Sequence, residues 1–95
     1  MKRIELHDEV VFDIAEIAER YPYELFEGPL DKLLTLISEQ PFLPQRVGDM
    51  LPERYRRAVL QRIGYVIVYE VLDESCFVIS IHDGRRAPGL WMRRL

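Results

Sequence analysis

The sequence predicts an α+β domain in which a helical hairpin covers one face of a mostly antiparallel sheet of about four strands. Two observations favour this class. Apolar residues recur at helical spacing within residues 10–37, whereas residues 55–82 contain short runs rich in β-branched and aromatic side chains. With 95 residues and 48% apolar content, the chain is expected to form one globular domain, 1–95.

The N-terminal half predicts a short strand followed by two helices. Residues 2–6 alternate between polar and apolar side chains, as a strand does. Asp8 is a suitable N-cap for a first helix, which Pro22 should end. Pro29 is expected at the first position of the second helix, where proline is favoured, and Pro41 should stop that helix. The short separation predicts an antiparallel helical hairpin.

The segment 42–54 has no clear period and predicts a long loop. We expect three of its apolar side chains to pack over an edge of the core: Phe42, Leu43 and Leu51. A functional or mobile loop is the alternative, since long connections in small domains often carry function.

The C-terminal half predicts three strands. Residues 55–62 fit either a strand or a helix, whereas residues 65–72 are apolar on both faces, as in a central strand. Residues 76–82 alternate, and the short polar link 73–75 predicts a β-hairpin between the last two strands. The alternation places three apolar side chains on one face: Phe77, Ile79 and Ile81.

The tail predicts one or two helical turns starting near Pro88. Trp91 is expected to pack this tail onto the sheet, because a lone tryptophan in a small domain usually closes the core. Anchoring a partner is the alternative for Trp91. Cys76, the one cysteine, is expected to be a buried small side chain.

Charge is distributed unevenly along the chain. Residues 1–53 carry 5 basic and 12 acidic side chains, whereas residues 54–95 carry 8 basic and 4 acidic ones. All the cations of the second part are arginines, whose planar guanidinium suits phosphates and carboxylates. We therefore expect an anionic partner to bind this part. The alternative is that the arginines pair with the acidic helices of the same chain.

Several classes of protein are excluded by the composition. No apolar run approaches the roughly 18 residues of a membrane helix, and the N-terminus lacks the pattern of a secretory signal, so we expect a cytoplasmic protein without membrane contact. One cysteine cannot form an internal disulfide. Two His-Asp pairs, at 7–8 and 82–83, are too few ligands for a metal site. No metal and no cofactor are expected.

A motif spans residues 62–91. The strand-like stretch 62–71 is rich in aromatic residues, and residues 78–88 end in His-Asp-Gly-Arg-Arg-Ala-Pro, with Trp91 nearby. These stretches resemble the RelE/ParE superfamily of toxins, in which a strand close to φ-P-Y-x-I-x-Y-x-V precedes H-x-x-R-R-D-P and a tryptophan. The resemblance covers nearly the whole chain and is specific over the motif. Gly64 and Ala87 stand where many relatives have proline and aspartate.

The resemblance implies the toxin of a bacterial type II toxin–antitoxin system, held silent in a hetero-oligomer by a cognate antitoxin. ParE-like relatives disable DNA gyrase and need no catalytic residues, whereas RelE-like relatives cut mRNA on the ribosome. We expect gyrase inhibition first, because no lysine follows Lys32 and arginine does not act as a base. The alternatives are an mRNA endonuclease and a non-toxic binding module of the same fold.

The candidate site residues lie in the second half of the chain. For RNA cleavage, His82 is the candidate base, because it is the side chain there that titrates near neutral pH. A structural histidine is the alternative. The arginines that would stabilise the phosphate are Arg57, Arg62, Arg85 and Arg86. Partner binding has a wider set of candidates: Arg57, Arg62, Tyr65, Tyr69, Arg85, Arg86, Trp91, Arg93 and Arg94.

Two expectations refine this set. Tyr65 and Tyr69 share a strand face and can stack on bases, or they can belong to the sheet core. The antitoxin is expected to lay a helix in a groove or add a strand to a sheet edge, with one of its carboxylates at Arg85 or Arg86.

Overall fold

A five-stranded mixed sheet with two helices on one face forms the body of the molecule, and the computed structural model describes residues 1–86 and 89–95. The helices are α1 (Val10–Arg20), α2 (Tyr23–Glu39) and a short 3-10 helix, η1 (Leu90–Arg94). The strands are β1 (Arg3–Leu6), β2 (Gln45–Arg46), β3 (Tyr55–Leu60), β4 (Tyr65–Val71) and β5 (Ser75–Asp83). The predicted α+β class is thus confirmed. The predicted start of the tail helix at Pro88 lies outside the described residues.

The strand order is β1-β5-β4-β3-β2. The three C-terminal strands form an antiparallel meander, and β1 adds to β5 in parallel, with Ile4 opposite Cys76. The ambiguous segment 55–62 is therefore a strand over residues 55–60, and its last two residues lie in a turn. β4 is central, and its side chains are buried on both faces, as its apolar composition predicted. Cys76 is buried, as expected.

The start of α1 differs from the prediction, because Asp8 does not cap it. The helix begins at Val10, whose backbone N–H donates to the His7 carbonyl at 2.9 Å. The N–H of Glu9 donates to His7 Nδ1 at 3.0 Å. The imidazole of His7 thus takes the place of the expected carboxylate at this end of the helix.

The predicted start of α2 at Pro29 is also wrong. The helix begins at Tyr23, directly after Pro22, and Pro29 lies inside it. Proline cannot donate the helical hydrogen bond of its turn, which costs stability. Phe26 in the first turn is only 2% exposed and packs edge-on against Tyr23, with ring centroids 5.7 Å apart. Burial of Phe26 helps to offset the missing hydrogen bond.

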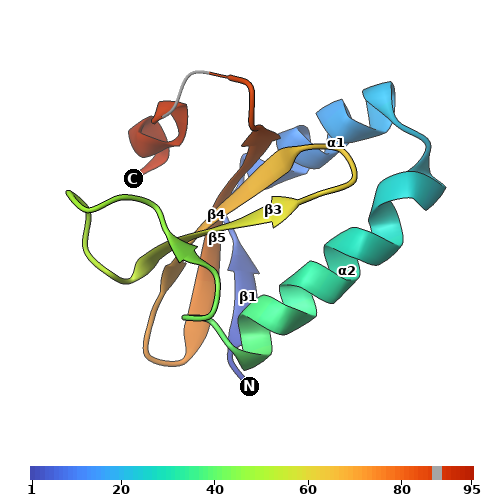
Figure 1. Ribbon diagram of the computed structural model, residues 1–95. Helices are drawn as coiled ribbons and strands as arrows, with labels where there is room; N and C mark the ends of the chain where they lie inside the picture. Colours follow the sequence, from blue (N-terminus) through green and yellow to red (C-terminus); the bar gives the residue numbers. More distant parts are fainter. Residues whose placement is uncertain (87–88) are drawn as a thin grey trace.

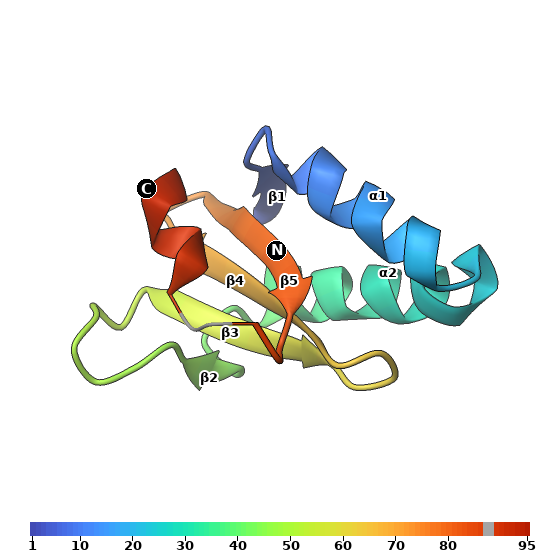
Figure 2. The same ribbon diagram turned by 90° about the horizontal axis from the view of Figure 1, so that it is seen from above.

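The sheet separates two apolar clusters. The larger cluster lies between the sheet and the helices and contains Ile17, Ile37, Tyr65, Ile67 and Tyr69. The smaller cluster lies on the opposite face and consists of Val66, Val68, Ile79 and Trp91. Figures 1 and 2 show α1 and α2 on one side of the sheet, with η1 and the loop after β2 on the other. This second face therefore carries the C-terminal tail.

A β-bulge in β5 overturns the prediction that Phe77, Ile79 and Ile81 share one face. Tyr69 pairs with Val78 and Val68 pairs with Ser80, so Ile79 is an extra residue. The extra residue shifts the alternation by one position. Ile81 consequently joins the cluster beneath the helices, whereas Phe77 and Ile79 face the tail.

The loop 42–54 packs differently from the expectation. Phe42 and Leu43 are 51% and 63% exposed, so they do not cover the core. The guanidinium of Arg56 instead lies over the Phe42 ring, and its carbon is 5.1 Å from the ring centroid. The expectation holds for Leu51, which packs with Val47 against the cluster on the tail side.

A buried tyrosine hydroxyl links β4 to the segment that directly follows α2. Tyr69 has no exposed surface, and its hydroxyl donates to the Pro41 carbonyl at 2.6 Å. We expect Tyr69→Phe to lower the free energy of unfolding by about 1 kcal/mol, because the carbonyl loses its partner. Urea unfolding measures this, with exposed Tyr23→Phe as the control. An unchanged midpoint would mean that water replaces the hydroxyl.

Candidate functional site

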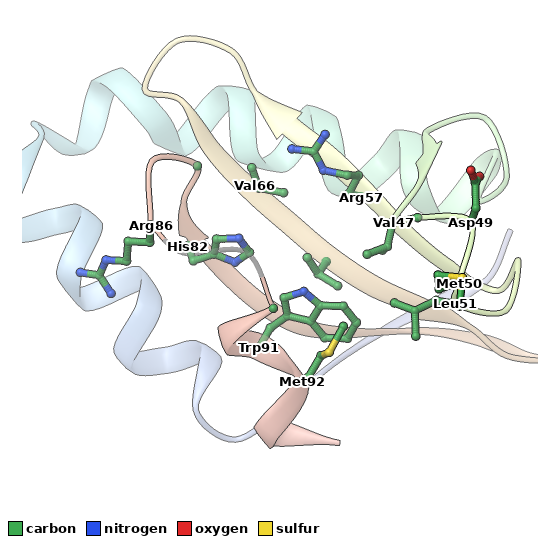
Figure 3. Close-up of a pocket in the computed structure, with 14 residues that line it drawn as sticks. Val47, Asp49, Met50, Leu51, Arg57, Val66, His82, Arg86, Trp91 and Met92 are labelled. Carbon is green, nitrogen blue, oxygen red and sulfur yellow. The ribbon is translucent and has the colours of Figure 1, made fainter.

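A groove of about 530 Å³ opens on the sheet face opposite the helices. Its floor is formed by Val66 and Val68 of β4, and one wall by the loop that contains Leu51. The other wall is η1, from which Trp91 and Met92 line the groove (Figure 3). Trp91 is only 5% exposed and its ring centroid lies 6.1 Å from that of Tyr55, so the tail is packed on the sheet as expected.

The register of the sheet brings Arg57 and His82 to the same face. Arg57 of β3 is opposite Val68, and His82 of β5 is opposite Val66. Val66 and Val68 are two residues apart on one strand and therefore point the same way. A cation and an imidazole thus line one groove from the two strands that flank β4 (Figure 3).

His82 is held in a defined position. Its Nδ1 lies 2.9 Å from Ser80 Oγ, which is 3% exposed on the same strand. When Nδ1 carries the proton and donates it to Ser80, the lone pair of Nε2 is left for a ligand. Burial lowers the pKa of His82 below its ordinary value; Asp13 opposes this. The guanidiniums of three arginines lower the pKa further: Arg57, Arg94 and Arg86. The lowered pKa favours the neutral imidazole at pH 7, and the neutral form can accept a proton.

The two arginines of the motif are engaged by the chain's own carboxylates. Arg85 donates from Nε and Nη2 to both oxygens of Asp83, at 3.0 and 2.8 Å. These hydrogen bonds hold the pKa of Asp83 well below its usual range. Arg86 pairs with Glu16 of α1, and Figure 3 shows its side chain pointing away from the groove. Neither is locked inside, since their side chains are 77% and 45% exposed.

Arg94 was a candidate for partner binding, but it follows the alternative expectation and pairs with an acidic side chain of α1. Its Nη1 and Nη2 donate to the two oxygens of Asp13, at 2.7 and 2.9 Å, and Nη1 also donates to the Ile79 carbonyl at 3.0 Å. Asp13 accepts the Ile81 N–H at 2.9 Å as well. The side chain of Arg94 is 18% exposed. It fastens η1 to α1 and to β5 rather than presenting a cation to a partner.

The other predicted residues divide between core and surface. Tyr65 and Tyr69 have no exposed surface and lie beneath the helices, so they cannot stack on a base in this conformation. Arg62 is exposed beyond the end of β3 and lines a shallow surface with α2, away from the groove. Arg93 is exposed on η1. Of the predicted set, the groove gathers His82, Arg57, Trp91 and part of Arg86.

Two glycines shape the end of the groove. Gly64 has φ +70°, which proline cannot adopt, so the turn before β4 excludes the proline of the RelE/ParE-like pattern. Gly84 donates to the Gly64 carbonyl at 2.9 Å, and a Cβ at Gly84 would lie 2.9 Å from that oxygen. The absence of a side chain at Gly84 therefore lets the two turns touch.

The sequence did not single out three contributors to the groove. Ser80 had a signal, because residues two apart on a strand share a face and it precedes His82 by two. Asp13 had none, because its partner Arg94 is 81 residues away. Val47 had none either, since its loop lacks a period, whereas Leu51 of the same loop was expected to pack over an edge of the core.

The partly buried imidazole of His82 predicts a pH dependence of stability. The folded pKa of His82 lies below the unfolded value of about 6.5, so the unfolded chain binds more protons as the pH falls through this window. The wild type should therefore lose more stability than His82→Gln between about pH 7 and pH 5. Urea unfolding of both proteins measures the difference. A wild type that gained stability relative to His82→Gln on acidification would contradict a lowered pKa.

Some kinds of site are absent from the described residues. Among residues 1–86 and 89–95, no group of three or more His, Cys, Asp or Glu side chains is placed to hold a metal ion. Over the same residues, neither long helix has the length and apolar character that crossing a bilayer requires. In comparisons with known proteins, no protein-family model and no curated protein matches the chain. The function must therefore be argued from the groove and the motif.

Proposed function

We propose that this chain is the toxin of a RelE/ParE-type toxin–antitoxin pair and that it cleaves RNA in the groove. The observation that carries the proposal is the position of His82 in one groove with Arg57. The resemblance of residues 62–91 to such toxins supports the class of protein. A toxin of this kind would act in the cytoplasm, where it meets mRNA.

The chemistry would use each groove residue in one role. His82 Nε2 takes the proton of a ribose 2′-hydroxyl, whose oxygen forms a bond to the adjacent phosphorus. The bond from phosphorus to the 5′ oxygen breaks, and the 5′ oxygen takes a proton from water. Arg57 stabilises the added negative charge on the phosphate oxygens. No ion pair to Arg57 is found among the residues the structure describes, so its charge is available.

Inhibition of DNA gyrase is the second candidate. In the described part of the groove, His82 is the one histidine, and the carboxylate of Asp49 lies toward the opposite end (Figure 3). RNA cleavage is faster with both an acid and a base, whereas binding to a topoisomerase requires neither. This sparse set of proton donors favours a toxin that acts by binding alone.

A cognate antitoxin is part of the proposal. Arg85 after the end of β5 and Arg93 on η1 are exposed, and an acidic segment can pair with them. A carboxylate at Arg85 would share the guanidinium with Asp83, because that pair already uses Nε and Nη2. The expected complex is a toxin–antitoxin hetero-oligomer.

Induced expression in bacteria tests the function. The wild type should stop growth and cut mRNA without loss of DNA supercoiling, whereas His82→Ala should be harmless. His7→Ala is the matched control, because His7 lies beside the start of α1 rather than in the groove. Toxicity of His82→Ala with loss of supercoiling would favour gyrase instead. A wild type that leaves growth unaffected without any antitoxin would indicate a non-toxic binding module.

A further inference from the structure

The groove has two chemically different parts. Its apolar part is formed by side chains of three elements: Val47, Leu51, Val68, Trp91 and Met92. Its polar part carries Arg57 and His82, and Figure 3 shows His82 and Leu51 toward opposite ends. The volume of about 530 Å³ falls in the range of small-ligand pockets, about 300–1,000 Å³.

We propose that this groove binds one nucleotide of single-stranded RNA, with the base against Leu51, Trp91 and Met92 and the phosphate beside Arg57 and His82. The inference rests on the proposed function and adds the position of the substrate. An unpaired base supplies a flat apolar body, and the phosphate supplies an anion at one end of it. An apolar side chain of a protein partner would fill the apolar part of the groove but would leave the guanidinium of Arg57 without an anionic partner.

The apolar part combines a fixed wall with adaptable side chains. Trp91 is fixed, because its ring packs near Tyr55 and Arg94 in the same short helix is bound to Asp13. Met92 is 45% exposed and Met50 is 96% exposed, and both line the groove with flexible thioether chains. Such side chains adjust to bases of different size. We therefore expect all four nucleotides to bind with similar affinity.

Trp91 is the one tryptophan of the chain, so its fluorescence reports directly on the apolar part. The purified protein is titrated with uridine 5′-monophosphate, with uridine and with ribose 5-phosphate. The nucleotide should change the emission of Trp91 and bind at least about tenfold more tightly than ribose 5-phosphate, because ribose 5-phosphate lacks the contacts of the base. The other three nucleoside monophosphates should bind within about threefold of it.

Two substitutions separate the parts of the groove. Arg57→Ala should weaken binding of the nucleotide about tenfold or more and leave binding of uridine unchanged, because a charge-assisted contact to phosphate is lost. Arg3→Ala is the matched control, since Arg3 lies on β1 at the far edge of the sheet. Equal effects of the two substitutions would overturn the phosphate position.

The remaining outcomes also decide the inference. Equal affinities for the nucleotide and ribose 5-phosphate, or no change in emission with any nucleotide, would overturn the base position and leave a protein segment as the occupant. Base-dependent binding by a chain that cuts no RNA would support this inference and overturn the proposed cleavage. Cleavage of RNA without base-dependent binding would support the proposed cleavage and overturn this inference.

Discussion

Replacing His82 with alanine is expected to lower the rate of RNA cleavage by about 10²- to 10⁴-fold, the usual contribution of a positioned base. The expectation follows from the neutral imidazole, whose pKa burial lowers, and from the Ser80 hydroxyl that holds Nδ1. Single-turnover cleavage of ribosome-bound mRNA measures the rate. The wild-type rate should rise with pH through a value below about 6.5, and this acidic limb should be absent from His82→Ala.

The control for this experiment is His7→Ala, which should keep both the rate and the pH profile of the wild type. Circular dichroism of both variants shows whether the fold is retained. If His82→Ala cleaved as fast as the wild type while folded, the imidazole would be structural and the proposed chemistry would be wrong.

Replacing Asp13 with alanine is expected to lower the free energy of unfolding by about 3 kcal/mol, because it leaves a mostly buried guanidinium without its carboxylate. The side chains of Asp13 and Arg94 are 13% and 18% exposed, so solvent screens the pair only partly. The substitution also removes the acceptor of the Ile81 N–H. Urea unfolding followed by circular dichroism gives the stability.

The same change should release η1 before the sheet unfolds. Trp91 reports this, because its emission moves to longer wavelength when the indole leaves the smaller cluster. Asp13→Asn keeps a hydrogen-bond acceptor but loses the charge. Its free energy of unfolding should therefore lie between those of the wild type and Asp13→Ala. Glu19→Ala, at an exposed position of the same helix, should stay within about 0.5 kcal/mol of the wild type. Equal losses of unfolding free energy for Glu19→Ala and Asp13→Ala would contradict the role given to the Asp13–Arg94 pair.

Element types were predictable where one period dominated. The run 65–72 is apolar on both faces, and its residues 65–71 form the central strand. The short polar link before β5 forms the hairpin. The helices were predictable for the same reason, but the start of α2 was not. The prediction used Pro29 as a local signal, whereas burial of Phe26 extends the helix in front of it.

The bulge in β5 could not be predicted from the alternation of polar and apolar residues. One extra residue at Ile79 moves Ile81 to the other face, and alternation alone cannot reveal the insertion. The bulge also puts Ile79 and Ser80 next to each other on the tail side, and His82, two residues after Ser80, therefore lies on that side as well.

The kinds of residue in the site were predictable, but which of them come together in the groove was less so. His82, Arg57 and Trp91 were singled out by chemistry or motif, and the sheet register and the packing of η1 bring them to one groove. Tyr65 and Arg94 were candidates for partner binding, with the sheet core and pairing to the chain's own acidic helices as the alternatives, and the structure places both in these alternative positions. Their positions depend on contacts with α1, which the motif does not encode.

The chemical nature of RNA ends in cells that express the protein tests most directly whether His82 and its groove cut RNA. Attack by the 2′-hydroxyl predicts new fragments with a 5′-hydroxyl and a 2′,3′-cyclic phosphate in the wild type, and none with His82→Ala. Growth arrest without new ends, or with 5′-phosphate ends that persist in His82→Ala, would contradict the account.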